Sequence, residues 1–109
     1  MTAREMLELA AKAAGYVPAT SDAGGPFVIF DGGEARDWNP LEDDGDALRL
    51  AVRLRLRVCC PTTDDDCALA SNGDVVAYSE DELHDEPRGD LYEATRRAIV
   101  RAAAEIGKG

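Results

Sequence analysis

The sequence predicts a single α+β domain over residues 1–109, an α/β/α-type sandwich in which three helices cover an about four-stranded, mainly antiparallel sheet. Three observations lead to this class. The length of 109 residues suits one domain with one core. Apolar residues recur at helical spacing near both ends and in the middle of the chain, and they alternate with polar residues around 54–60. The elements follow in the order α-β-α-β-β-β-α.

The first helix is predicted over residues 3–14. Thr2 and Glu5 form a capping box, and the helix carries an apolar stripe with spacings of three and four. Gly15 is the expected left-handed terminator, and Pro18 prevents continuation. The stripe consists of Ala3, Met6, Leu7, Ala10 and Ala14.

Residues 19–26 read as a loop, and the apolar run 27–30 that follows reads as a strand with a central place in the sheet. Asp31, Gly32 and Gly33 close that strand. Trp38 then precedes a tight turn at Asn39-Pro40, where it is either a core residue or a recognition residue.

A second helix is expected after this turn, capped by Asp43 or Asp44. The acidic run 42–46 lies where the helix dipole favours negative charge. The residues expected to face the core are Ala47, Leu48, Ala51, Val52 and Leu54.

Residues 54–79 are predicted to form an antiparallel meander. Leu56, Val58 and Cys60 alternate with Arg55, Arg57 and Cys59, so one face of this strand should be packed. A loop over 61–66, a strand over 67–70, a two-residue hairpin at Asn72-Gly73 and a return strand over 74–78 follow.

The last helix opens with a second capping box, Asp90 to Glu93, and runs to about Ile106, with Gly107 as its terminator. Arg96, Arg97 and Arg101 are expected outside, paired with acidic loops. The inward residues are Leu91, Ala94, Ala98, Ile99, Ala102, Ala103 and Ile106.

Two blocks of this sequence resemble the "phage ABA sandwich" domain of bacteriophages and prophages. The first is Trp-Asn-Pro-Leu at residues 38–41 with the following residues 43–51, and the second is residues 94–107. The resemblance implies an α/β/α sandwich encoded by a phage or prophage, and it implies no catalytic residues. The pair Cys59-Cys60 and the run 64–66 depart from the family pattern.

The net charge of −10 is the compositional outlier, with 22 acidic and 12 basic residues. Such a chain should be repelled by nucleic acid and by anionic membranes, and attracted to basic surfaces. The charge either keeps the protein soluble or forms a surface that competes with nucleic acid for a basic groove. The residues predicted for such a partner-binding surface are Asp43, Asp44, Asp46, Asp64, Asp65, Asp66, Glu80, Asp81 and Glu82.

Cysteine and histidine give no catalytic or metal-binding pattern that predicts a cofactor. Cys59, Cys60 and Cys67 lack C-x-x-C pairs, so they read as small hydrophobic residues in a reducing compartment. A metal site of Cys60, Cys67 and His84 would be one ligand short. The acidic runs also lack the EF-hand spacing.

The leading hypothesis is a non-enzymatic phage accessory protein that binds a host protein with a basic surface. Its most concrete version is an inhibitor of a host defence complex such as a CRISPR effector. The alternatives are a divalent-metal-binding protein or enzyme that uses the acidic loops, and a structural component of the virion or replication module. With no signal peptide and no apolar stretch of ~20 residues, the expected location is the host bacterial cytosol. Homodimerisation through a free sheet edge fits any of these hypotheses.

Overall fold

The computed structural model of the chain describes residues 2–19, 27–31, 33–60, 68–78 and 91–108. Within them lie three helices and six short strands. In chain order the elements are α1 (Ala3–Ala14), β1 (Val17–Ala19), β2 (Val28–Asp31), β3 (Glu34–Asp37), α2 (Asp44–Arg53), β4 (Arg57–Cys59), β5 (Leu69–Ser71), β6 (Val76–Tyr78) and α3 (Leu91–Lys108).

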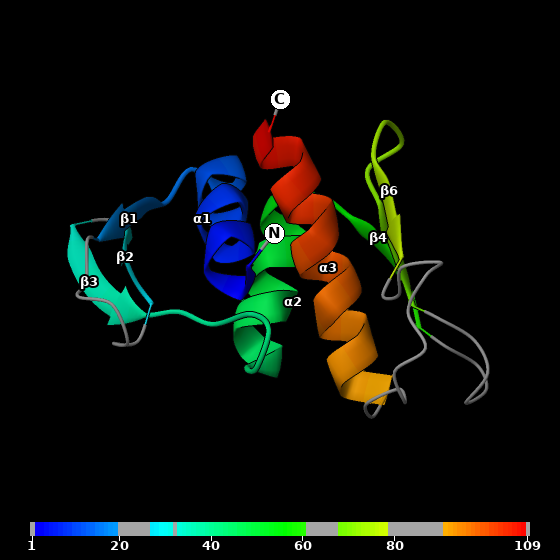
Figure 1. The fold of residues 1–109 in the computed structure, drawn as a ribbon, viewed down its shortest axis with the longest axis horizontal. Coiled ribbons are helices and arrows are strands. Elements are labelled where there is room, and N and C mark those ends of the chain that lie inside the picture. Colours follow the sequence, from blue (N-terminus) through cyan, green and yellow to red (C-terminus); the bar gives the residue numbers. More distant parts are fainter. Residues whose placement is uncertain (1, 20–26, 32, 61–67, 79–90, 109) are drawn as a thin grey trace.

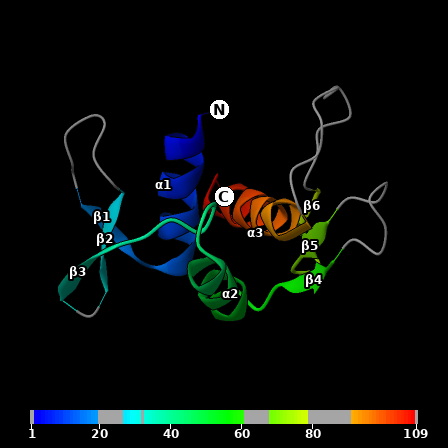
Figure 2. The same cartoon turned by 90° about the horizontal axis from the view of Figure 1, so that it is seen from below.

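The helices form the middle layer, and a three-stranded antiparallel sheet lies on either side of them (Figure 1). The sheet β1-β2-β3 lies beyond α1, while β4-β5-β6 lies against α3, and the same order is seen from below (Figure 2). The α+β class and the mainly antiparallel pairing are therefore confirmed. The predicted single four-stranded sheet with helices outside it is wrong, because the strands divide into two sheets with the helices between them.

The strands β1 and β3 were not predicted, and they account for the sheet β1-β2-β3. β2 pairs with both of them, with Val17 opposite Phe30 and Ile29 opposite Arg36. Neither strand shows apolar alternation, and β1 contains a proline, which is tolerated because β1 is an edge strand. The central place of β2 is confirmed, but only one of its faces is packed, since Ile29 is buried and Phe30 is exposed.

The first helix follows the sequence prediction. The Thr2 hydroxyl accepts a hydrogen bond from the backbone N–H of Glu5 at 3.1 Å, as an N-cap does. Gly15 ends the helix with a φ of 82°, and its N–H donates to backbone carbonyls of the last turn. The side chain of Arg53 at the end of α2 donates to the carbonyl of Ala14, which ties the ends of α1 and α2 together.

The second helix packs through a narrower face than predicted. Ala47 and Ala51 are buried as expected, together with Leu50. Leu48 and Val52 are 64% and 68% exposed, so their assignment to the core is wrong. Among the helices, α2 packs chiefly against α3. Because one neighbouring helix covers only one side of α2, Leu48 and Val52 remain exposed.

The last helix does not end at Gly107, because it continues to Lys108. Gly107 instead lies where α3 crosses α1: a β-carbon there would stand 2.8 Å from the carbonyl carbon of Leu9 and would overlap its oxygen. Glycine is required by the close approach of two helices and not by a turn. The buried alanines of this region are Ala10, Ala11 and Ala14 of α1 and Ala98, Ala102 and Ala103 of α3.

The meander β4-β5-β6 is confirmed, with three corrections: to the start of its first strand, to the place of Cys60 and to the predicted two-residue hairpin loop. Arg55 has a φ of 56° and belongs to the turn after α2, so the strand begins at Arg57 and not at Leu54. Cys60, predicted on the packed face, follows the strand and is exposed. The hairpin loop spans four residues, since Ser71 pairs with Val76, and the Asn72 side chain accepts from the N–H groups of Asp74 and Val75.

Candidate functional site

The turn between β3 and α2 is anchored in the core by Trp38. Its ring lies edge-on to Tyr16, with centroids 5.8 Å apart, and tilted against Phe27 at 5.9 Å. Its backbone N–H donates to the carbonyl of Phe27 at 2.9 Å. Trp38 is fully buried, so of the two interpretations of this residue the core residue is confirmed.

Asp46 lies at the centre of the turn. One carboxylate oxygen accepts from the backbone N–H of Asn39 at 3.0 Å, and the other accepts from Arg49 at 2.8 Å. Arg36 of β3 lies 3.8 Å from the same carboxylate. Asp46 raises the pKa of Arg49 above its ordinary value, chiefly through this hydrogen bond. Asp46 was predicted as a partner-binding residue, but its side chain is buried and hydrogen-bonded within the chain. It therefore stabilises the turn and presents little negative charge to solvent.

Asp43 and Asp44 combine a structural contact with an exposed carboxylate. Asp43 is the N-cap of α2, and its side chain accepts from the N–H of Asp46 at 2.7 Å. Asp44 forms an ion pair with Arg96 of α3 at 2.5 Å, as the sequence suggested for the arginines of that helix. The side chains of Asp43 and Asp44 nevertheless remain 59% and 65% exposed, so both present negative charge to solvent.

An open hollow of about 460 Å³ lies beside this turn. Its acidic residues come from the end of β3, from the turn that follows and from the start of α2, and the buried side chains of Phe27 and Trp38 also border it. The Glu42 carboxylate contacts the side-chain amide of Asn39 at 3.4 Å, and no ion pair to Asp37 or Glu42 is found within the described part of the chain. The residues that line the hollow are Phe27, Asp37, Trp38, Asn39, Glu42, Asp43 and Asp46.

The hollow can accept a positively charged side chain. Exposed carboxylates suit the charged end of a lysine or arginine, which forms charge-assisted hydrogen bonds with them. Within the ranges that the structure describes, no group of three or more histidine, cysteine or acidic residues is arranged to hold a metal ion. We refer below to the exposed carboxylates of Asp37, Glu42, Asp43 and Asp44 as the acidic surface.

Sequence reasoning identified part of this surface. Asp43 and Asp44 lie in it, whereas Asp37 was missed because it precedes Trp38 on a strand that was not predicted. Glu42 was recognised as part of the acidic run but was not chosen as a partner-binding residue. The remaining predicted residues, Asp64, Asp65, Asp66, Glu80, Asp81 and Glu82, lie outside the described residues, as do Cys67 and His84 of the three-residue metal hypothesis.

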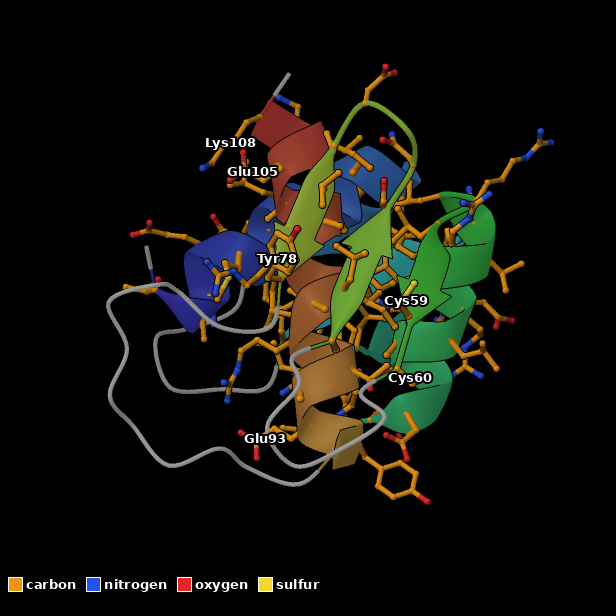
Figure 3. The ribbon with its side chains drawn as sticks, turned by 90° about the vertical axis from the view of Figure 1, so that its right-hand side faces the viewer. Cys59, Cys60, Tyr78, Glu93, Glu105 and Lys108 are labelled. Carbon is orange, nitrogen blue, oxygen red and sulfur yellow. The ribbon has the colours of Figure 1, made fainter. Side chains whose placement is uncertain are left out.

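The outer face of the sheet β4-β5-β6 carries the exposed Cys59, and the exposed Cys60 directly follows β4 (Figure 3). Cys59, Leu69 and Tyr78 occupy one row across β4, β5 and β6. Cys59 and Cys60 are free thiols and both are exposed; this agrees with the partly solvated face predicted for Cys59 and not with the packed face predicted for Cys60. Val76 and Tyr78 add exposed apolar surface to this face.

Comparisons of this chain with protein-family models, with curated proteins and with solved structures gave no match. Among the described residues, none of the helices is both long and apolar enough to cross a membrane.

Proposed function

We propose that this protein is a non-catalytic accessory protein, encoded by a phage or prophage, that binds a basic surface of a host protein in the bacterial cytosol. The single observation that carries the proposal is the acidic surface beside the open hollow, in which the side chains of Asp37, Glu42, Asp43 and Asp44 are all exposed. The resemblance of residues 38–51 and 94–107 to the phage ABA sandwich domain supports the phage origin.

The concrete form of the proposal is inhibition of a host defence complex, such as a CRISPR effector, by occupation of a groove that normally holds nucleic acid. A net charge of −10 favours association with such a groove and repels nucleic acid itself. The runs 64–66 and 80–82 add six further acidic residues to the chain in this proposal. Association driven by charge should be fast and should weaken with salt.

The test is retention of a host protein by the immobilised chain at low and at high salt. The variant Asp37→Lys/Glu42→Lys reverses exposed charges of the acidic surface that make little structural contact. The matched control is Glu8→Lys/Glu105→Lys, which makes the same change of net charge on exposed positions of α1 and α3. We expect salt-sensitive retention that the first variant loses and the control keeps. Equal retention by both variants would refute a role for the acidic surface.

A second candidate is a binder of a divalent cation such as Mg²⁺, Mn²⁺ or Ca²⁺, in which carboxylates of the acidic surface would need ligands from the acidic runs 64–66 and 80–82, because the described residues alone form no group of three metal ligands. Titration calorimetry with each metal alone distinguishes the two candidates. Heat that disappears in Asp37→Asn/Glu42→Gln would favour metal binding, and the absence of heat at millimolar metal would exclude it.

A further inference from the structure

Two cysteines stand next to each other where β4 leaves its sheet. Cys59 is the last residue of β4 and lies opposite Leu69, and Cys60 directly follows the strand (Figure 3). Both are free thiols and both are exposed. Thiol–disulfide exchange requires an accessible sulfur, which buried cysteines lack. The pair therefore meets the first requirement of a reactive thiol site.

The charged residues nearest to this pair along β4 are basic. Arg57 lies two residues before Cys59 on the same strand, so the two side chains project from the same face of the sheet. Arg55 precedes the strand and is exposed. Neither arginine is paired with an acidic residue in the part of the chain that the structure describes. An exposed thiol thus lies beside positive charge in a chain whose net charge is −10.

We propose that Cys59 and Cys60 form a dithiol site that reacts with an anionic disulfide of low molecular weight, such as glutathione disulfide. The Cys59 sulfur attacks one sulfur of glutathione disulfide and forms a mixed disulfide, and one reduced glutathione leaves with the proton of Cys59. The Cys60 sulfur then attacks the Cys59 sulfur and forms a Cys59–Cys60 disulfide, and the second reduced glutathione leaves with the proton of Cys60. Two electrons and two protons thus pass from the protein thiols to glutathione disulfide.

The strand geometry assigns different tasks to the two thiols. Arg57 shares a face with Cys59 and attracts the carboxylates of glutathione, so Cys59 is the thiol that forms the mixed disulfide. Cys60 lies beyond the last residue pair of the β4–β5 register. Because no strand pairing fixes its backbone, Cys60 can turn toward Cys59 in the second step.

The disulfide between the two cysteines should be easy to reduce. Adjacent α-carbons are about 3.8 Å apart, whereas most disulfides join α-carbons about 4.4–6.8 Å apart. The ring is therefore strained, and strain favours the two thiols. The site stays reduced in excess reduced glutathione and reacts when glutathione disulfide accumulates. The inference is independent of the proposed function, because neither cysteine belongs to the acidic surface.

Mass spectrometry of the folded full chain tests the site. Cys67 lies outside the described residues, so Cys67→Ser serves as the parent in which Cys59 and Cys60 are the remaining thiols. After incubation with glutathione disulfide, this parent should have lost two hydrogen atoms and should carry no glutathionyl group. Cys60→Ser in the same background should retain one glutathionyl group on Cys59. Excess reduced glutathione should reverse both changes.

The rate of the first step tests the role of Arg57. Arg57→Glu should slow the reaction of Cys59 with glutathione disulfide by about fivefold and leave its reaction with the neutral hydroxyethyl disulfide unchanged. Lys12→Glu, at an exposed position of α1, makes the same change of net charge and is the matched control. It should keep the wild-type rate with both disulfides. Circular dichroism confirms that each variant is folded.

Four results would overturn the inference. The first is a native chain that does not react until denaturant is added. The second is a glutathionyl group that persists on the Cys67→Ser parent, since the ring then does not form. The third is a loss of hydrogen atoms in the wild type that requires Cys67. The fourth is a rate with glutathione disulfide that Arg57→Glu and Lys12→Glu change equally.

Discussion

Gly107→Ala should destabilise the protein although it replaces a helical glycine. In an exposed helix interior the same change stabilises by up to about 1 kcal/mol, since alanine loses less backbone entropy on folding. At Gly107 the new methyl group would overlap the carbonyl oxygen of Leu9 and stand 2.8 Å from its carbon. Backbone atoms of a packed helix cannot rotate away, so α1 and α3 must separate or the end of α3 must unwind.

The size of the effect follows from two opposing terms. Overpacking of a core contact destabilises by about 1–3 kcal/mol, and the helix-propensity gain is small so near the end of α3. We expect a loss of about 1–2 kcal/mol, or a Tm lower by about 4–8 °C. Gly45 of α2 is the matched control, because its nearest neighbours are the ends of the flexible Arg49 and Asp43 side chains at 3.2 Å. Gly45→Ala should leave stability unchanged or raise it slightly.

Urea unfolding provides the assay. The buried Trp38 is the only tryptophan, so its fluorescence reports the loss of the core. A Gly107→Ala variant as stable as the wild type, or more stable, would show that the α1–α3 approach does not require glycine.

Three further predictions concern the turn before α2. Trp38→Ala should lower the free energy of unfolding by about 3–5 kcal/mol, measured by circular dichroism, and a loss below about 1 kcal/mol would contradict its place in the core. Asp46→Ala should lower the free energy of unfolding by about 1–3 kcal/mol, because the N–H of Asn39 loses its acceptor. Asp46→Asn keeps an acceptor oxygen and should destabilise the protein less. Equal destabilisation by the two variants would argue against this contact. Asp43→Ala removes the N-cap of α2 and should lower stability by about 1 kcal/mol in urea unfolding, so an unchanged midpoint would refute its capping role.

Features that depend on neighbours in the sequence were predictable from the sequence. The capping residue Thr2, the terminator Gly15 and the cap Asp43 act through hydrogen bonds or backbone angles within one turn of helix. The β4-β5-β6 meander was also predictable, because alternation and the Asn72-Gly73 turn are local signals. Asp43 and Asp44 of the acidic surface were also predictable, because the acidic run 42–46 is visible in the local sequence.

The division of the strands into two sheets could not be predicted. β1 and β3 have no apolar alternation, and they are strands because β2 provides hydrogen-bonding partners on both edges. The resulting three-layer order places the helices in the middle, and α3 then lies between α1 and the second sheet. Such pairing depends on residues that are distant along the chain.

The amino-acid order by itself determined the helices, the caps of α1, the N-cap of α2 and the antiparallel meander, since these follow from interactions over a few residues; the predicted cap Asp90 of α3 lies outside the described residues. Tertiary structure alone decided the roles of Gly107 and Leu48. A glycine near a helix end has the same local signature whether it terminates the helix or contacts another helix. A leucine at helical spacing has the same local signature whether it is buried or faces solvent. Which of these occurs depends on how closely the helices approach one another, and that distance is set by packing of the whole chain.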